Sequence, residues 1–219
     1  MAIEKVRAPR HDRTKIQRLQ GGTLTVVVGK ETQTQTFLIH ETPARKVSDF
    51  FDKALSGPWK ESKERTVELP EVDPDVFALF VHWFYFKSLP VGHDDIGAEK
   101  DMEYMELAKT YVLGDMLVSS ALKNAAIDAI VEKSLTPKAD ENTYYPSIEE
   151  IQYIYSNTVD GADIRRLMVD LYFEHGNDSW LKSKTDFPNA FLLALAEDCL
   201  EERRRDSEWI KPERYHASA

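Results

Sequence analysis

Residues 37–85 decide the fold; they read FLIHETPARKVSDFFDKALSGPWKESKERTVELPEVDPDVFALFVHWFY. The stretch closes on a strong helix signal, in which Asp73 is placed to cap the helix and Pro74 takes the first helical position. The helix predicted from Asp75 to about Phe86 has apolar residues nearly all round its axis, which is typical of a helix buried at the centre of a domain. The residues expected in the core from this helix are Phe77, Phe80 and Trp83.

Two short helices are predicted earlier in the same stretch. Thr42 followed by Pro43 favours an N-cap with proline at the first helical position, and that helix should end near Val47. Ser48 is expected to cap a second helix, which Gly57-Pro58 ends. The second helix has an apolar stripe at helical spacing, formed by Phe50, Phe51, Ala54 and Leu55.

Three strands are predicted around these helices. Residues 23–28 are β-branched and apolar, which suits the centre of a sheet. A turn at residues 29–31 joins them to a second strand at 33–39, so the two runs should form an antiparallel hairpin. The third strand is short, at 65–69, and is closed by Pro70. Strands and helices in this order predict an α+β fold in which helices wrap a small sheet.

The second half of the chain is predicted to be helical. Residues 87–101 form a loop rich in Pro, Gly and Asp, and residues 134–146 form a polar linker. Ser147 and Glu150 have the spacing of a capping box. The helices are expected at 102–117, 119–133, 147–157, 162–174 and 188–205. The expected organisation is therefore a flexible basic tail at 1–20, a domain at 21–133, the linker 134–146, an all-helical extension at 147–205 and a flexible tail at 206–219.

Charge is distributed unevenly along the 219 residues. The chain carries 28 Lys and Arg against 38 Asp and Glu, giving a net charge of −10. Residues 1–20 have a net charge of +4, which leaves −14 for the remainder. An acidic body argues against nucleic acid as a partner. For the basic tail, a solvated terminus is favoured over an arm for nuclear targeting or nucleic-acid contact, because its basic residues are scattered.

Composition also bears on the compartment. The single cysteine, Cys199, excludes an intramolecular disulfide and fits a reducing environment. The longest apolar run, Val76 to Phe86, is shorter than the roughly 20 residues that span a bilayer. The N-terminus lacks the apolar run of a signal peptide. We therefore expect a soluble protein of the cytoplasm or nucleus that makes no membrane contact.

The residues give little support for an enzyme. The six histidines are dispersed, no glycine-rich phosphate loop follows a strand, and no pattern of metal ligands occurs, so no catalytic residue, metal or cofactor is predicted. His93-Asp94-Asp95 is interpreted as a polar loop and Cys199 as a small core residue. His40, where a strand gives way to a helix, is expected to satisfy backbone groups there while its ring packs over the hairpin, rather than to act as a ligand or acid–base group.

Several features of residues 37–85 occur in the order found in the BTB/POZ domain, which the segment resembles. They include His40 after an apolar strand, Ser48 before Phe50-Phe51, and Trp83-Phe84-Tyr85 at the end of the central helix. Further matches lie at 107–115 and 122–125. Residues 164–170 and Phe187-Pro188 resemble the helical extension of stand-alone BTB proteins of filamentous fungi.

The resemblance implies a non-enzymatic module for protein–protein interaction, acting by self-association or by partner binding. The alternative that it implies is a substrate adaptor docked on a cullin scaffold of a ubiquitin ligase. The candidate interaction surface is formed by Thr23, Pro43, Ala44, Val47 and Tyr85. Members commonly have an aspartate at the position of Thr23 and two leucines at Pro43 and Ala44, so only a weak homodimer is expected. The cullin-binding signature, an apolar residue, any residue and glutamate, occurs only as Tyr104-Met105-Glu106 inside a predicted helix.

Overall fold

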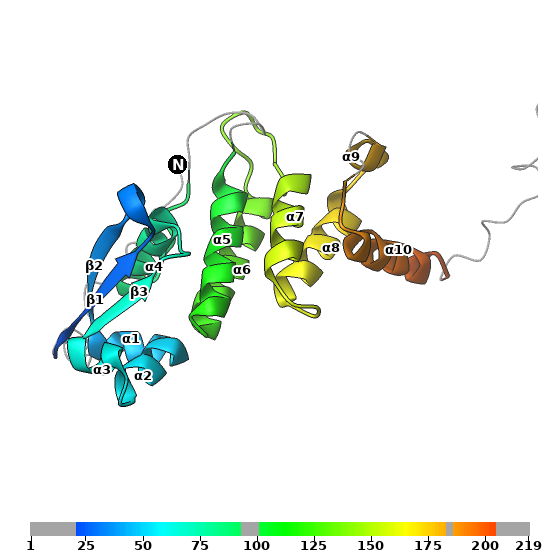
Figure 1. Ribbon diagram of the computed structural model, residues 1–219. Helices are drawn as coiled ribbons and strands as arrows, with labels where there is room; N and C mark the ends of the chain where they lie inside the picture. Colours follow the sequence, from blue (N-terminus) through cyan, green and yellow to red (C-terminus); the bar gives the residue numbers. More distant parts are fainter. Residues whose placement is uncertain (1–20, 93–100, 183–185, 205–219) are drawn as a thin grey trace, which may run out of the picture. The chain divides into compact units, whose positions relative to one another are not determined.

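The computed structural model describes residues 21–92, 101–182 and 186–204 (Figure 1). The predicted tails and His93-Asp94-Asp95 lie outside these residues. The chain divides into two compact units, of which unit 1 comprises residues 1–91 and 109–126, and unit 2 comprises residues 92–108 and 127–219. The domain boundary expected at residue 133 therefore falls inside unit 2.

Unit 1 contains a mixed three-stranded sheet in the order β2-β1-β3. The strands are β1 (Thr23–Val28), β2 (Gln35–His40) and β3 (Thr66–Leu69). The predicted hairpin is confirmed, because β1 and β2 pair antiparallel with Thr23 opposite His40. The second strand begins later than residue 33, since Glu31–Gln33 form a 3₁₀ turn, η2. The central position of β1 is also confirmed: it pairs with β3 in parallel, with Thr25 opposite Thr66.

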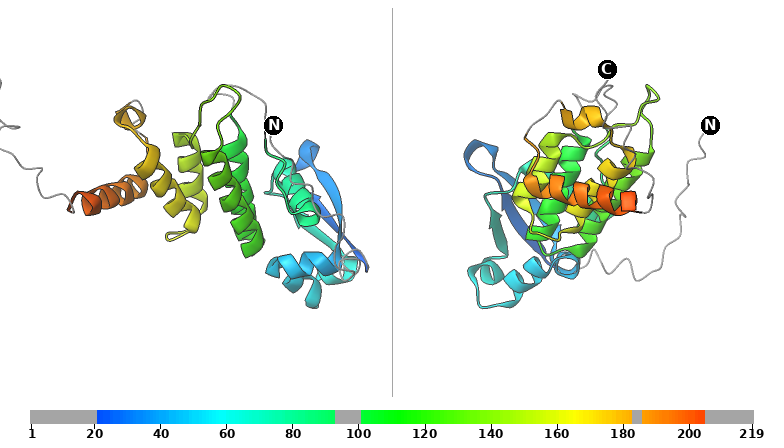
Figure 2. Two further views of the ribbon diagram at one scale, coloured as in Figure 1. Left: turned by 180° about the vertical axis from the view of Figure 1, so that it is seen from behind. Right: turned by 90° about the vertical axis from the view of Figure 1, so that its right-hand side faces the viewer.

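Three short helices gather at the end of the sheet where β2 ends and β3 begins (Figures 1 and 2). They are α1 (Glu41–Val47), α2 (Asp49–Ser56) and α3 (Lys60–Glu64). The cap predicted at Thr42 is wrong, because the chain turns directly from β2 into α1 and His40 holds the N-cap position. Pro43 is still tolerated in the first turn of α1, where backbone N–H groups have no partner within the helix.

Ser48 caps α2 as predicted. Its Oγ accepts a hydrogen bond from the backbone N–H of Phe51 at 3.2 Å and donates to the carbonyl of Leu117 at 2.6 Å. The backbone N–H groups of Asp49 and Phe50 donate to the carbonyls of Val118 and Leu117. The first turn of α2 is therefore tied to residues 117–118, far away in the sequence.

The core of unit 1 is built around α4 (Pro74–Phe86), which lies against the sheet (Figures 1 and 2). Asp73 caps this helix by accepting a hydrogen bond from the backbone N–H of Asp75, as expected. Phe77 and Phe80 are fully buried and Trp83 is 4% exposed, which confirms the predicted central helix. The expectation of apolar burial fails for Phe86, which is 56% exposed because it lies at the last position of the helix.

Unit 2 is helical in its described residues. Helices α5 (Glu103–Met116) and α6 (Ser120–Leu135) contribute residues to both units, and unit 2 continues with α7 (Ile148–Asn157), α8 (Asp163–His175), α9 (Asp178–Lys182) and α10 (Asn189–Arg204). The capping box at Ser147 and Glu150 is confirmed. Helix α10 packs on α8 (Figure 2), with Phe191 and Leu195 buried.

The interpretation of Cys199 as a core residue is wrong. The cysteine is exposed, and so is Leu200 beside it. The buried face of α10 is defined instead by Phe191 and Leu195, four residues apart.

A buried ion cluster lies in unit 2, centred on Lys133. Its ammonium group is 2.7 Å from a carboxylate oxygen of Asp101 and 2.7 Å from one of Glu103, and Lys138 also contacts Asp101 at 3.3 Å. The Lys133 side chain is 6% exposed and that of Asp101 is 4% exposed. Burial opposes ionisation of Asp101, but hydrogen bonding and charge from Lys133 hold its pKa below the usual value.

Candidate interaction surfaces

The interaction surface predicted from the sequence is only partly available. Thr23 is exposed, while Pro43, Val47 and Tyr85 are half-buried. Ala44 is fully buried in the core of unit 1, so its assignment to a surface is wrong. The side chain points inward because α1 uses this position to pack on the unit's own core.

His40 and Tyr85 are joined at the end of β2. The backbone N–H of His40 donates to the Tyr85 hydroxyl at 3.2 Å, and the same oxygen lies 2.9 Å from His40 Nδ1. Since the hydroxyl accepts from the backbone, its own proton is available to Nδ1. The tyrosine, rather than the histidine ring, therefore satisfies the backbone at the strand end, and His40 keeps a structural position.

Charges on α1 are largely compensated within the chain. Arg45 Nε donates to Asp52 at 2.8 Å, and its guanidinium lies 3.4 Å from Glu41. Glu41 also contacts Arg65 at 3.0 Å. Like-charge repulsion between two copies of α1 would thus be reduced at Arg45, whereas Lys46 remains exposed.

A groove of about 670 Å³ runs beside β3, and we call it the β3 groove. Its wall is formed by α2, α3, the outer side of β3 and Val118. The apolar lining residues are Phe50, Ala54, Trp59, Val67, Pro70 and Val118, and the polar ones are Lys53, Lys60, Glu61, Glu64, Thr66 and Glu68. Trp59 is 61% exposed and Val118 is 53% exposed. Large apolar side chains that are exposed to solvent in a concave site are typical of a binding surface.

Gly57 gives Trp59 its place in this groove. A Cβ atom added at Gly57 would clash with the indole Nε1 of Trp59. The backbone of Gly57 itself is extended, with φ −90°, so a side chain there would strain no dihedral angle. Glycine is therefore required by the close approach of the indole rather than by the backbone conformation.

Val118 is held in a conformation that costs free energy. It has φ 49°, in the left-handed region that β-branched residues rarely adopt. It follows the C-terminus of α5, where Ser119 N–H bonds to the Gly114 carbonyl and Val118 N–H bonds to the Asp115 carbonyl. Glycine usually takes this position in such a helix end. A strained valine that also lines a groove is a pattern associated with functional sites.

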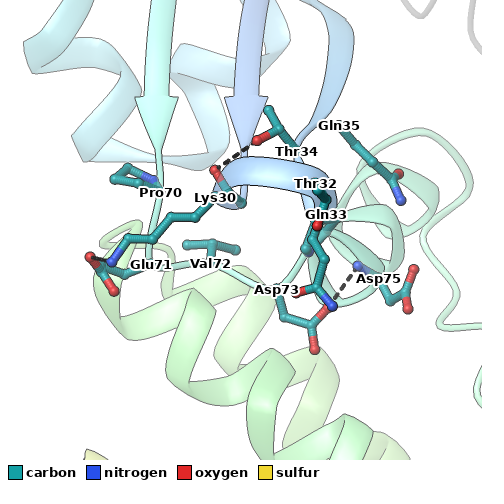
Figure 3. Close-up of a pocket in the computed structure, with 12 residues that line it drawn as sticks. Lys30, Thr32, Gln33, Thr34, Gln35, Pro70, Glu71, Val72, Asp73 and Asp75 are labelled. Atoms are coloured by element: carbon teal, nitrogen blue, oxygen red, sulfur yellow. Dashed lines mark hydrogen bonds and ion pairs between the residues drawn. The ribbon is translucent and has the colours of Figure 1, made fainter.

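A second hollow lies at the opposite end of the sheet, between the β1–β2 turn and the β3–α4 connection (Figure 3). Lys30 and Glu71 form an ion pair across it, and Asp73 is occupied by the cap of α4 and by Lys109 at 3.2 Å. Polar side chains that already pair with one another would add little binding free energy for a ligand. The β3 groove is thus the better candidate for partner binding.

No catalytic or metal centre emerges in the described part of the chain. His40 bonds to Tyr85, His82 Nδ1 lies 2.8 Å from the Ser88 carbonyl, and the ring of His175 stacks on Tyr145 at 4.7 Å. Among these residues, no three His, Cys, Asp or Glu side chains gather as metal ligands. Within the same residues, every helix is too short or too polar to cross a bilayer.

Tyr104-Met105-Glu106, the triplet that fits the cullin-binding signature, lies in α5. Its apolar member, Tyr104, is 3% exposed, and its hydroxyl donates to the Tyr144 carbonyl at 2.8 Å. Burial raises the pKa of Tyr104, in the same sense as the nearby carboxylates of Asp101 and Glu103. A buried tyrosine does not present an apolar contact to a scaffold protein.

Sequence reasoning missed the β3 groove. Phe50 and Ala54 are spaced for the buried stripe of a helix, and Val118 lies 59 positions beyond Trp59. The one available signal was Gly57-Pro58-Trp59, a tryptophan in a turn between two predicted elements.

Comparison with known proteins agrees with this architecture. A family model for the BTB/POZ domain matches residues 17–122, which include all three strands and α1 to α4. None of the curated proteins compared with the chain matches it. The BTB/POZ domain is a protein-interaction domain and is generally non-enzymatic. The match and the small sheet wrapped with helices agree that residues 17–122 form a BTB/POZ domain, which further helices follow.

Proposed function

We propose that this protein is an interaction module that binds a partner protein in the β3 groove rather than by tight self-association. The observation that carries the proposal is Trp59, whose indole is 61% exposed and yet fixed in position over Gly57. A preplaced aromatic side chain loses little conformational freedom on binding. Tryptophan is also the residue type most enriched among the few that dominate binding energy.

The expected result of Trp59→Ala is a loss of partner binding without loss of the fold. Removing such an anchor typically costs about 2–4 kcal/mol of binding free energy, or roughly 30- to 1,000-fold in affinity. Partners are recovered by affinity capture of the full chain and identified by mass spectrometry. Phe86→Ala is the matched control, because it removes an exposed aromatic of unit 1 that does not line the groove. Equal recovery with Trp59→Ala and with the wild-type chain would contradict the proposal.

Two further variants change the groove without removing Trp59. Gly57→Ala should displace the indole and weaken binding of the same partners, while the backbone there accepts alanine without strain.

Val118→Gly should weaken binding, because it removes an apolar side chain from the groove lining. Its free energy of unfolding should stay the same or rise by up to about 1 kcal/mol, because the substitution relieves the left-handed strain. Denaturant unfolding and affinity measurement on the same samples check both. A clear loss of stability in Val118→Gly would show that the strain is absent.

Self-association through α1 is expected to be weak, with dissociation in the roughly micromolar range or looser. Specific interfaces bury about 800 Å² per partner, and α1 offers little apolar surface once Ala44 and part of Val47 are used in the core. Lys46 leaves some like-charge repulsion that low salt strengthens. Sedimentation velocity over a dilution series at two salt concentrations tests this. A dimer that persists at nanomolar concentration and is indifferent to salt would contradict it.

A cullin-adaptor role has only the family resemblance in its favour. The triplet that fits the expected signature has its tyrosine buried. The groove-binding role is therefore preferred.

A further inference from the structure

Unit 2 contains a cavity of its own, which we call the aromatic pocket. It has a volume of about 420 Å³ and lies between the segment that enters α7 and the helices α8 and α9 (Figure 1). The aromatic residues that line it are Tyr144, Tyr145, Tyr172, Trp180 and Phe187. Tyrosine and tryptophan at this density around a cavity are typical of a ligand site rather than of an ordinary polar surface.

The rings stand at steep angles to one another. Trp180 makes an angle of 74° with Tyr172, at 5.1 Å between the ring centroids, and Phe187 makes an angle of 77° with Tyr172. Tyr145 lies 5.4 Å from Trp180 and stacks on His175 at 4.7 Å. Rings arranged in this way form the sides of a box, and the face of each ring carries partial negative charge. The walls therefore favour a cation.

Carboxylates lie beside the same pocket. The backbone N–H of Ser147, a lining residue, donates to Glu150 at 2.7 Å, and the Ser147 hydroxyl donates to Glu149. Burial raises the pKa of Tyr172, and the negative charges of Glu150 and Glu149 act in the same sense, so both carboxylates lie within electrostatic reach of that wall. In residues 101–182 and 186–204, the lining includes no Lys or Arg. Carboxylates and ring faces together give the pocket a negative potential.

The kind of cation follows from the polar atoms of the wall. A metal ion or a bare ammonium group needs oxygen atoms that replace its bound water. Here the Tyr172 hydroxyl already donates to the Pro146 carbonyl at 3.0 Å, and the Ser147 hydroxyl is engaged with Glu149. A quaternary ammonium group has no N–H to satisfy and spreads its charge over methyl groups. Ring faces and a negative potential are sufficient to bind it.

We propose that the aromatic pocket binds a quaternary ammonium group, the chemistry shared by choline and by the side chain of trimethylated lysine. Trp180 and Tyr145 form its accessible walls, since both are half-buried, and the buried rings of Tyr172 and Phe187 form its floor. The pocket shares no residue with the β3 groove, so it gives the protein a second binding site that does not depend on the first.

NMR of the ligand in the presence of the full chain tests the inference, with choline chloride as the probe. The methyl protons of choline should shift upfield and the shift should saturate, because ring currents act on groups held against aromatic faces. The matched control ligand is dimethylbutanol, the isostere of choline with a neutral carbon in place of the nitrogen. It should bind at least about tenfold more weakly, because it lacks the charge that the rings attract.

Variants of the walls separate attraction by the rings from simple apolar contact. Trp180→Leu should weaken choline binding at least about tenfold, because it removes a ring but keeps an apolar side chain. Tyr145→Leu makes the same change outside α9 and should also weaken binding, so the test survives if α9 does not form in the first variant. The matched control is Tyr153→Leu, which alters a half-buried tyrosine of α7 outside the pocket and should bind choline as the wild-type chain does.

A pair of peptides identifies the source of the group. One contains a single trimethyllysine and the other has unmodified lysine at the same position. Tighter binding of the trimethylated peptide than of choline would assign the pocket to a partner protein, and the reverse would assign it to a small molecule; both results support the inference.

Three results would overturn the inference: no saturable binding of choline or of the trimethylated peptide, equal binding of choline and dimethylbutanol, or equal weakening in Tyr153→Leu. These measurements use no partner of the β3 groove and alter no residue that lines it. Failure of the inference and failure of the proposed function are therefore separate outcomes.

Discussion

Trp83→Ala is expected to lower the free energy of unfolding by about 3–5 kcal/mol. The side chain is 4% exposed, its ring centroid lies 6.2 Å from that of Phe80, and the ammonium group of Lys87 lies 4.1 Å above the ring. The substitution removes this aromatic burial and leaves a cavity in the middle of unit 1. Domains of ordinary stability have about 5–15 kcal/mol in total, so poor soluble yield is expected.

Denaturant unfolding measures this effect, and Phe86→Ala is its control. Both substitutions truncate an aromatic of α4, but Phe86 is 56% exposed and should cost less than about 1 kcal/mol. A cost below about 1 kcal/mol for Trp83→Ala as well would mean that α4 is not the centre of the core.

Lys133→Met is expected to destabilise unit 2 by about 3–5 kcal/mol, because it leaves Glu103 without its cation and Asp101 with only the longer contact to Lys138. Asp101 and Glu103 each lose a contact of 2.7 Å, and Asp101 is almost fully buried. Methionine fills nearly the same volume, so the effect reports on charge rather than on a cavity. The control is Lys109→Met. Lys109 pairs with Asp73, whose side chain is half-exposed, so this substitution should lower the free energy of unfolding by only about 0.2–1 kcal/mol.

The same cluster predicts a pH dependence of stability. The pKa of Asp101 is lowered in the folded chain, so this carboxylate contributes stability above its unfolded pKa of about 3.9, and that contribution is lost as the pH falls through the folded value. Acid unfolding should therefore depend on Lys133 below about pH 4. If the difference between wild type and Lys133→Met stays constant between pH 7 and pH 3, the ion pair does not stabilise the fold.

Local signals predicted most of the fold because they act within a few residues. Ser48, Asp73 and Ser147 were each identified as caps from the residue type and its neighbours, and each caps its helix. Capping depends on a side chain reaching a backbone N–H two or three residues away, so the sequence contains the whole interaction.

Tertiary contacts account for what the sequence did not reveal. Helix α3 has no apolar stripe and no side-chain cap, and it is held by Ser62 Oγ, which donates to the Leu55 carbonyl at 3.0 Å. Helix α9 was not predicted because it is only five residues long, which is too short to show a helical spacing of apolar residues. On α10, apolar residues occur on both faces, so periodicity placed Cys199 in the core although Phe191 and Leu195 define the buried side.

The candidate surface was the least predictable part. The resemblance directed attention to α1, where Ala44 proved to be buried. The β3 groove depends on one local contact, the indole over Gly57, and on two contacts between distant residues: residues 117–118 against the start of α2, and the parallel pairing of β3 with β1. The two long-range contacts have no signature in a single stretch of sequence.

The most direct test of the groove as the binding site is the hydrogen-exchange footprint of a captured partner on the full chain. Protection on binding should concentrate on Thr66 to Glu68, on α2 around Phe50 and Ala54, and at Val118. It should be lost with Trp59→Ala. Protection confined to α1, or to the described helices of unit 2, with exchange in the groove unchanged, would contradict the account.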